Sequence, residues 1–314
     1  MPPSRDAAPR SADGPTILVV SDQQDWHVRQ LEVAFNAVGA RVVRIDLAAC
    51  DFDTRSPSGL ALPLLGAQLP DAVHVRTLSA GSFEAITKRL GVLHALAKLG
   101  VVVWNDARAI ERCVDKSMTS FLLARAGVPT PPTWTMESAE TARALVERRA
   151  PSGALVLKPL FGAQGKGLRL IRRPDDLPAS EDVGGVYYLQ RFQQNGTEDF
   201  RDYRLFVLRG RVVAAMMRSA STWITNVKQG GKPLAVAPDP GMERLAIAAA
   251  EAVGATIAGV DVLQGIDGGP TVLEVNSMPA WSGLQKVSAR NVAEAIASAL
   301  IDELARRPTQ RRVP

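Results

Sequence analysis

Three oxygen-bearing side chains in the last fifth of the sequence have spacings that suit a metal site. Two apolar runs flank Asp267-Gly268, a dipeptide favoured in two-residue hairpin turns. A hairpin centred on that turn places Asp261 opposite Glu274, with Asn276 two residues further along the same face. Oxygen ligands of this kind suit Mg²⁺, which commonly binds a few carboxylates together with substrate phosphates. The alternative is that the three side chains face solvent on a sheet with one exposed side.

A glycine-rich segment follows an apolar run that ends at Lys158. Its glycines at Gly162, Gly165 and Gly167 allow backbone N–H groups to point at an anion. The segment 168–172 then alternates as a strand, which places the glycines at the tip of a hairpin and excludes both a Walker A loop and a Rossmann turn. The pattern predicts a flap that closes over a triphosphate, with Lys158 neutralising phosphate charge. A glycine-rich surface turn beside a solvated lysine is the alternative.

Alternating strands and helices occupy the first third of the chain and predict a parallel sheet. The strands are expected at 16–20, 41–47, 72–75 and 101–104, and the helices at 26–38 and 83–99. Arg76 and Ser79 follow the third strand, where the ligands of parallel sheets bind, so they are candidate substrate contacts. A solvated loop is the alternative for these two residues.

The rest of the chain predicts a mixed α+β region with antiparallel hairpins. A helix at 115–126 leads into a proline-rich linker at 127–132. The remaining helices are expected at 137–149, 242–253 and 289–305, and the strands at 154–158, 168–172, 186–192, 203–209, 212–218, 257–263 and 271–276.

The composition excludes a largely disordered chain and a disulfide-stapled one. Of 314 residues, 46% are hydrophobic and 22% charged, which suits a globular protein of two or three domains. The net charge of +5 comes mostly from four arginines in 305–314, so specific nucleic-acid binding is not expected. Two distant cysteines and the lack of an apolar run of about 18 residues favour a cytoplasmic protein without a membrane span.

Taken in order, these motifs resemble the ATP-grasp superfamily and, within it, the RimK-type glutamate ligases. The resemblance covers roughly 95–300 and implies an ATP-grasp fold preceded by a parallel-sheet pre-ATP-grasp domain. The implied nucleotide contacts are Lys116, Lys158, Gly162, Gly165, Gly167, Gln190, Arg191, Phe192, Asp202 and Asn226. The implied metal ligands are Asp261, Glu274 and Asn276, and the implied catalytic cations are Arg204 and Arg218.

Two positions depart from the family pattern. Arg191 stands in the hinge strand where an acidic residue is usual, and Ile224 precedes Thr225-Asn226 where RimK-type ligases often have an arginine. The second departure removes a cation near the phosphates or the substrate. The segments 274–279 and 281–284 look most similar to ligases that add glutamate to the tail of a pterin cofactor.

The resemblance implies an ATP- and Mg²⁺-dependent (or Mn²⁺-dependent) carboxylate–amine ligase that works through an acyl phosphate. Its substrates are expected to be L-glutamate and a small-molecule carboxylate. A protein terminus as acceptor and a non-catalytic nucleotide-binding module are the alternatives, and a homo-oligomer is compatible with the sequence. We expect an arm at 1–14, a pre-ATP-grasp domain at 15–110, ATP-grasp lobes at 111–192 and 193–304, and a basic tail at 305–314.

Overall fold

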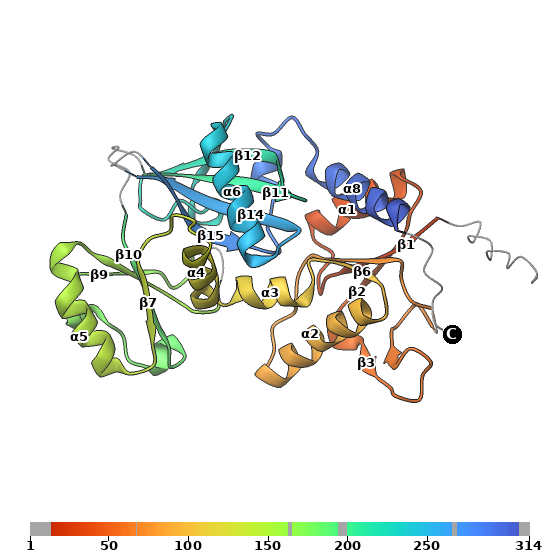
Figure 1. Cartoon of the computed structure of the whole chain (residues 1–314), viewed down its shortest axis with the longest axis horizontal. Helices are drawn as coiled ribbons and strands as arrows, with labels where there is room; N and C mark the ends of the chain where they lie inside the picture. The colour runs from red at the N-terminus through yellow and green to blue at the C-terminus, as the bar shows by residue number, and fades with distance from the viewer. Residues whose placement is uncertain (1–13, 67, 163–164, 194–199, 266–268, 308–314) are drawn as a thin grey trace, which may run out of the picture. The chain divides into compact units, whose positions relative to one another are not determined.

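The computed structural model describes residues 14–66, 68–162, 165–193, 200–265 and 269–307 (Figure 1). The predicted hairpin turn Asp267-Gly268 lies outside the described residues. The chain divides into two compact units. The first comprises Met1–Trp104 and Ala293–Pro314, and the second Asn105–Val292.

The first unit is built on a four-stranded parallel sheet, which confirms the prediction for the N-terminal third. Its strand order is β2-β1-β5-β6, and every neighbouring pair is parallel. The strands are β1 (Thr16–Val20), β2 (Arg41–Ile45), β5 (Ala72–Val75) and β6 (Val102–Trp104). The helices are α1 (Trp26–Ala37), α2 (Phe83–Lys98) and α8 (Val292–Arg306). A short hairpin of β3 (Asp51–Phe52) and β4 (Leu60–Ala61) was not predicted.

Side-chain caps fix where two of these helices begin. The Asp25 carboxylate accepts a hydrogen bond from the Val28 amide at the start of α1, and the Ser82 hydroxyl accepts one from the Ala85 amide at the start of α2. Such caps satisfy backbone donors that have no partner inside the helix.

The second unit contains two antiparallel sheets. The smaller has the order β7-β10-β8-β9, and the larger has the order β13-β12-β11-β14-β15. The smaller comprises β7 (Thr133–Met136), β8 (Leu155–Lys158), β9 (Arg169–Ile171) and β10 (Tyr187–Arg191). The larger comprises β11 (Phe200–Leu208), β12 (Arg211–Ala220), β13 (Lys232–Ala235), β14 (Ile257–Gln264) and β15 (Pro270–Asn276). The predicted β8–β9 hairpin that carries the glycines is confirmed.

Five α-helices accompany these sheets in the described part of the second unit. They are α3 (Ala107–Val114), α4 (Lys116–Arg125), α5 (Ala139–Arg149), α6 (Pro240–Val253) and α7 (Ser282–Gln285). One face of α6 packs on the large sheet through its alanines and Val253, and this forms the core beneath the strands that carry the charged residues. β7, β13, α3 and α7 were not predicted from the sequence. Within the described residues, no helix combines the length and apolar character that a membrane span requires.

A buried asparagine ties together the ends of the two strands that carry the carboxylates. The Asn105 amide nitrogen donates to the carbonyls of Ile257 (2.7 Å) and Ser277 (2.5 Å), and its oxygen accepts from the Ile257 amide (2.9 Å). Asn105 is 1% exposed, so losing the side chain would leave these backbone groups unpaired away from water.

We expect Asn105→Ala to lower the free energy of unfolding by about 2–3 kcal/mol, because it removes three buried hydrogen bonds. Chemical denaturation followed by circular dichroism measures this change. Asn36→Ala, an exposed position on α1, is the matched control and should stay within about 0.5 kcal/mol of the parent. Equal effects of the two variants would contradict a clamping role for Asn105.

Candidate active site

Three charged residues form a row across neighbouring strands of the large sheet. Arg204 on β11 pairs with Asp261 on β14, and Asp261 pairs with Glu274 on β15. The predicted register of Asp261 opposite Glu274 is therefore confirmed. Asn276 lies two residues beyond Glu274, opposite Gly259, and its side-chain nitrogen is 3.5 Å from the Gly259 carbonyl oxygen.

The hairpin departs from the simple register on the other side of Asp261. Val262 pairs with Val272, so Leu273 is an extra residue on β15 and forms a β-bulge. The simple register would have paired Val262 with Leu273. That pairing was wrong because hairpin alternation alone gives no sign of a bulge.

A second pair of opposite charges adjoins the row. Asp202 on β11 pairs across the sheet with Arg218 on β12. Arg218 Nε donates to Asp202 Oδ1 (2.7 Å), and Arg218 Nη2 contacts both Asp202 Oδ2 and Asp261 Oδ2, the latter at 3.0 Å. Arg204 donates to Asp261 through Nε and Nη2, both at 2.7 Å. Two arginines and two aspartates thus form one connected, buried network.

The electrostatics of this network favour the charged forms of Asp261 and Arg218. Burial alone would raise the pKa of Asp261, but the guanidinium groups of Arg204 and Arg218 outweigh it and lower the pKa to about 2. The pKa of Arg218 is raised: burial opposes this, and the Asp261 and Asp202 carboxylates more than compensate. Each buried charge is therefore matched by opposite charge, as buried ions require.

Glu274 differs from Asp261 in having no such partner. Within the part of the chain that the structure describes, its half-buried carboxylate has no hydrogen bond or ion pair. It lies within electrostatic range of Lys158 and Lys116, whose pKa values burial lowers and Glu274 partly restores. Glu274 is thus a carboxylate with free oxygen atoms near two lysines.

The oxygen donors of this face fit a magnesium ion. They are the two carboxylates Asp261 and Glu274 and the amide of Asn276. No cluster of three or more His, Cys, Asp or Glu side chains placed for a metal occurs among the described residues. A site with two carboxylates needs further oxygen atoms, which nucleotide phosphates commonly supply to Mg²⁺.

The two lysines lie at the base of the glycine flap. Lys158 ends β8, and the Lys116 ammonium donates to the carbonyls of Leu160 (3.2 Å) and Gly162 (2.9 Å). Asp115 caps the helix that begins at Lys116 by accepting from two backbone amides. The start of α4 is therefore attached to the first limb of the flap.

Two flap residues must be glycine for geometric reasons. Gly165 and Gly167 have φ values of +70° and +73°, in the left-handed region that other residues avoid. A Cβ on Gly165 would lie 2.6 Å from Asn226 Oδ1 and 2.9 Å from Ile224 Cγ2. The flap therefore approaches the segment that carries Ile224 and Asn226 so closely that no side chain fits between them.

The hinge strand β10 contributes both Gln190 and Arg191 to this site, and the guanidinium of Arg191 is bonded to groups of the protein itself. Gln190 is 2% exposed, and its nitrogen donates to Thr133 Oγ1 (3.4 Å) and Tyr188 Oη (3.5 Å). The Arg191 guanidinium donates to the carbonyls of Arg149 and Gly153 and packs 5.9 Å from the Trp134 ring centroid. Arg191 thus binds the end of α5, and its charge is used within the protein.

A cavity lined by residues of both sheets of the second unit brings most of the predicted site residues together. Those that line it are Lys158, Gln190, Arg191, Phe192, Asp202, Arg218, Asn226, Asp261 and Glu274. Lys116, Arg204, Asn276 and the three flap glycines are not among its lining residues. Of these, Arg204 donates to the lining residue Asp261, and Gly165 closely approaches Ile224 and Asn226. The cavity also has the apolar lining residues Val156, Leu168, Leu263 and Leu273, which were not predicted from the sequence. The strand alternation that placed Lys158 and Asp261 could have identified Val156 and Leu263.

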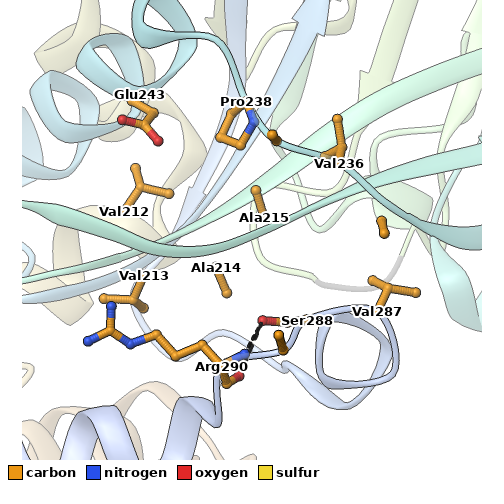
Figure 2. A pocket seen from close by; sticks show the side chains of 13 residues that line it. Val212, Val213, Ala214, Ala215, Val236, Pro238, Glu243, Val287, Ser288 and Arg290 are labelled. Atoms are coloured by element: carbon orange, nitrogen blue, oxygen red, sulfur yellow. Dashed lines mark hydrogen bonds between the residues drawn. The ribbon is translucent and has the colours of Figure 1, made fainter.

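A second cavity of about 500 Å³ lies against β12 and has a different character. Figure 2 shows its lining, which is mainly the valines and alanines of 212–215 and 235–237 with the loop 287–290. Glu243 and Arg290 are its charged residues, and the Arg290 amide donates to Ser288 Oγ. It contains no grouping of charged side chains comparable to the row on β11, β14 and β15.

Arg76 and Ser79 lie in the first unit and are engaged there. Arg76 is 6% exposed, with Nη2 3.4 Å from His27 Nδ1 and 3.9 Å from Asp25 Oδ2. Ser79 Oγ donates to Asp46 Oδ1 at 2.8 Å. Both residues stand at the carboxyl ends of the parallel strands, as predicted, and their contact with a substrate stays a prediction.

Comparison with known proteins identifies the family. Residues 113–300 match the model of the RimK-like ATP-grasp domain. The chain belongs to the RimK-like ATP-grasp family. The tetrahydromethanopterin:alpha-L-glutamate ligase of Methanosarcina acetivorans is 30% identical to this RimK-like chain, over 89% of the chain and 96% of the relative. The Methanococcus maripaludis enzyme of the same name is 36% identical, over 65% of this chain and 69% of the relative. A probable alpha-L-glutamate ligase of Pseudoalteromonas translucida is 30% identical, over 85% of this chain and 89% of the relative.

Solved structures agree on the fold of this RimK-like chain. The ATP-grasp ligase PsnB, in complex with a minimal precursor, Mg and ADP, matches with a TM-score of 0.70 at 22% identity, covering 92% of this chain and 98% of PsnB. The D-cycloserine synthetase DcsG matches with a TM-score of 0.67 at 20% identity, covering 92% of this chain and 99% of DcsG. The ATP-grasp fold predicted from the sequence is confirmed.

The flap geometry makes one substitution informative. We expect Gly165→Ala to weaken the binding of Mg·ADP by about tenfold or more, because the new methyl group would collide with Asn226 and strain the backbone. Isothermal titration calorimetry measures the affinity. Gly184→Ala is the matched control, since Gly184 also has positive φ (+61°) but would place its Cβ in open space. Equal affinities of the two variants would show that the close contact does not matter.

Proposed function

We propose that this RimK-like ligase uses ATP and Mg²⁺ to join L-glutamate to the carboxylate of a small molecule, with a pterin-type cofactor as the favoured acceptor. The observation that carries the proposal is that Asp261 and Glu274 line one cavity with Lys158, while Arg204 donates to Asp261 from the neighbouring strand. It is supported by similarity to tetrahydromethanopterin:alpha-L-glutamate ligases along most of the chain.

The chemistry requires activation because a free carboxylate does not acylate an amine in water. Transfer of the γ-phosphoryl group of ATP to the acceptor carboxylate gives an acyl phosphate and ADP. The glutamate amine then attacks the acyl carbon, and phosphate leaves as the amide forms. The protein contributes mainly positioning and charge neutralisation, as in other phosphoryl transfers.

The described residues suit these tasks. Lys158 and Lys116, with the backbone amides near the flap glycines, would bind the phosphates, and Asn226 lies where the flap meets its neighbouring segment. The apolar lining beside Gln190 and Phe192 would receive the adenine ring. Asp261, Glu274 and Asn276 would hold Mg²⁺, which when bound neutralises phosphate charge. Arg204 would face the negative charge that develops on the reacting oxygens.

A ligase assay tests the proposal directly. We expect phosphate release by the full chain to require ATP, Mg²⁺, L-glutamate and a carboxylate acceptor such as a pterin with a carboxylate tail. Mass spectrometry should show one or more added glutamyl residues on the acceptor. Mn²⁺ in place of Mg²⁺ tests the wider metal preference. Glutamyl addition only to a polypeptide would replace the proposed acceptor class, and no turnover with any acid–amine pair would favour a nucleotide-binding module.

Glu274 offers a sharp variant for the same assay. We expect Glu274→Gln to reduce turnover by at least about a hundredfold, because the amide removes a charged ligand opposite the phosphates. Glu251→Gln, an exposed position on α6, makes the same chemical change away from the site and should retain full turnover. Full activity of Glu274→Gln would remove Glu274 from the metal site.

A further inference from the structure

The carboxylate expected to bind the metal is already bound by arginine in this structure. Asp261 Oδ1 accepts from Arg204 Nε, while Asp261 Oδ2 accepts from Arg204 Nη2 and also contacts Arg218 Nη2. A carboxylate has about four lone-pair positions, so three are taken by these contacts. A divalent cation at Asp261 would also face two guanidinium groups at close range, which is electrostatically unfavourable.

The two arginines differ in how firmly they are fixed. Arg218 donates to both oxygens of Asp202 in addition to its contact with Asp261, and its side chain is 3% exposed. The Arg204 side chain is 12% exposed and, among the described residues, its guanidinium forms hydrogen bonds to Asp261 alone. Arg204 can therefore leave Asp261 at lower cost, whereas Arg218 would have to abandon a second buried carboxylate.

We propose that Arg204 occupies the metal-facing side of Asp261 until a divalent cation replaces it, and that the exchange frees its guanidinium for the reacting phosphoryl and carboxylate oxygens. Binding of the metal ion and release of the Arg204 guanidinium then occur in the same step. Arg218 stays with Asp202 and is a positioning residue. This inference rests on the proposed function, because it takes Asp261 as a metal ligand.

The exchange also accounts for the charge balance of the site. With Arg204 on Asp261, two arginines and two aspartates neutralise one another, and Glu274 remains beside Lys158 and Lys116. When a cation binds to Asp261 and Glu274, Arg204 becomes an unpaired positive charge at the edge of the site. An incoming phosphate or carboxylate is the partner that such a charge requires.

Metal binding without nucleotide tests the proposal. Mn²⁺ serves as the probe, because the electron paramagnetic resonance signal of free Mn²⁺ reports binding to the full chain. We expect Arg204→Met to bind Mn²⁺ at least about tenfold more tightly than the parent, since a competing unit charge is removed a few ångströms from the ion. Arg211→Met makes the same change at the exposed start of β12 and should bind Mn²⁺ within about twofold of the parent.

Two further variants keep the result interpretable. Arg204→Met with Asp261→Asn should lose the tighter binding, and Arg204→Lys, which keeps the charge but not the two-point contact, should show a smaller gain. Arg204→Lys also replaces Arg204→Met if that variant does not fold. In thermal unfolding, Mn²⁺ should raise the midpoint of Arg204→Met more than that of the parent.

Unchanged Mn²⁺ affinity in Arg204→Met and Arg204→Lys would overturn the proposal, as would tight binding that survives Asp261→Asn. These measurements need no turnover. A chain that binds Mn²⁺ as expected but fails every ligase assay would therefore refute the proposed function alone.

Discussion

The second unit is organised around charge that must be neutralised away from water. Arg204, Asp261, Asp202 and Arg218 sit on adjacent strands, and removing Arg218, for example, would leave the buried Asp202 carboxylate without its counter-ion. Such an ion costs several kcal/mol, far more than an exposed pair contributes. The register of β11 against β12 and β14 is thereby tied to the pairing of specific charges as well as to hydrophobic packing.

The surrounding architecture holds that register in place. The alanine-rich face of α6 packs beneath the large sheet, and Asn105 fixes β14 at its start and the chain just beyond the end of β15. The smaller sheet supplies Lys158 and residues of the hinge strand to the same cavity. Rigid strands on two sheets can hold opposed charges at fixed separation, which suits a reaction that depends on placing phosphates accurately.

Local patterns were enough to predict the hairpins, the parallel sheet and the pairing of Asp261 with Glu274, because these depend on alternation and short turns. The contact of Arg204 with Asp261 was not predictable in this way, since it joins strands 57 residues apart. The sequence also could not show that Arg191 turns its guanidinium towards the end of α5. The edge strand β7 was missed because it is only four residues long and directly follows the proline-rich linker.

The extra residue on β15 allows one strand to meet two opposite chemical needs. Neighbouring residues of a regular strand face opposite sides, yet Leu273 and Glu274 both line the same cavity, and the register shift lies beside them. The apolar side chain of Leu273 and the carboxylate of Glu274 thus come from consecutive positions, whose backbones are about one residue length apart. A nucleotide has the same polarity along its length, with a flat aromatic base at one end and a metal-bound polyanion at the other. In a regular hairpin, either Leu273 or Glu274 would face away from the cavity.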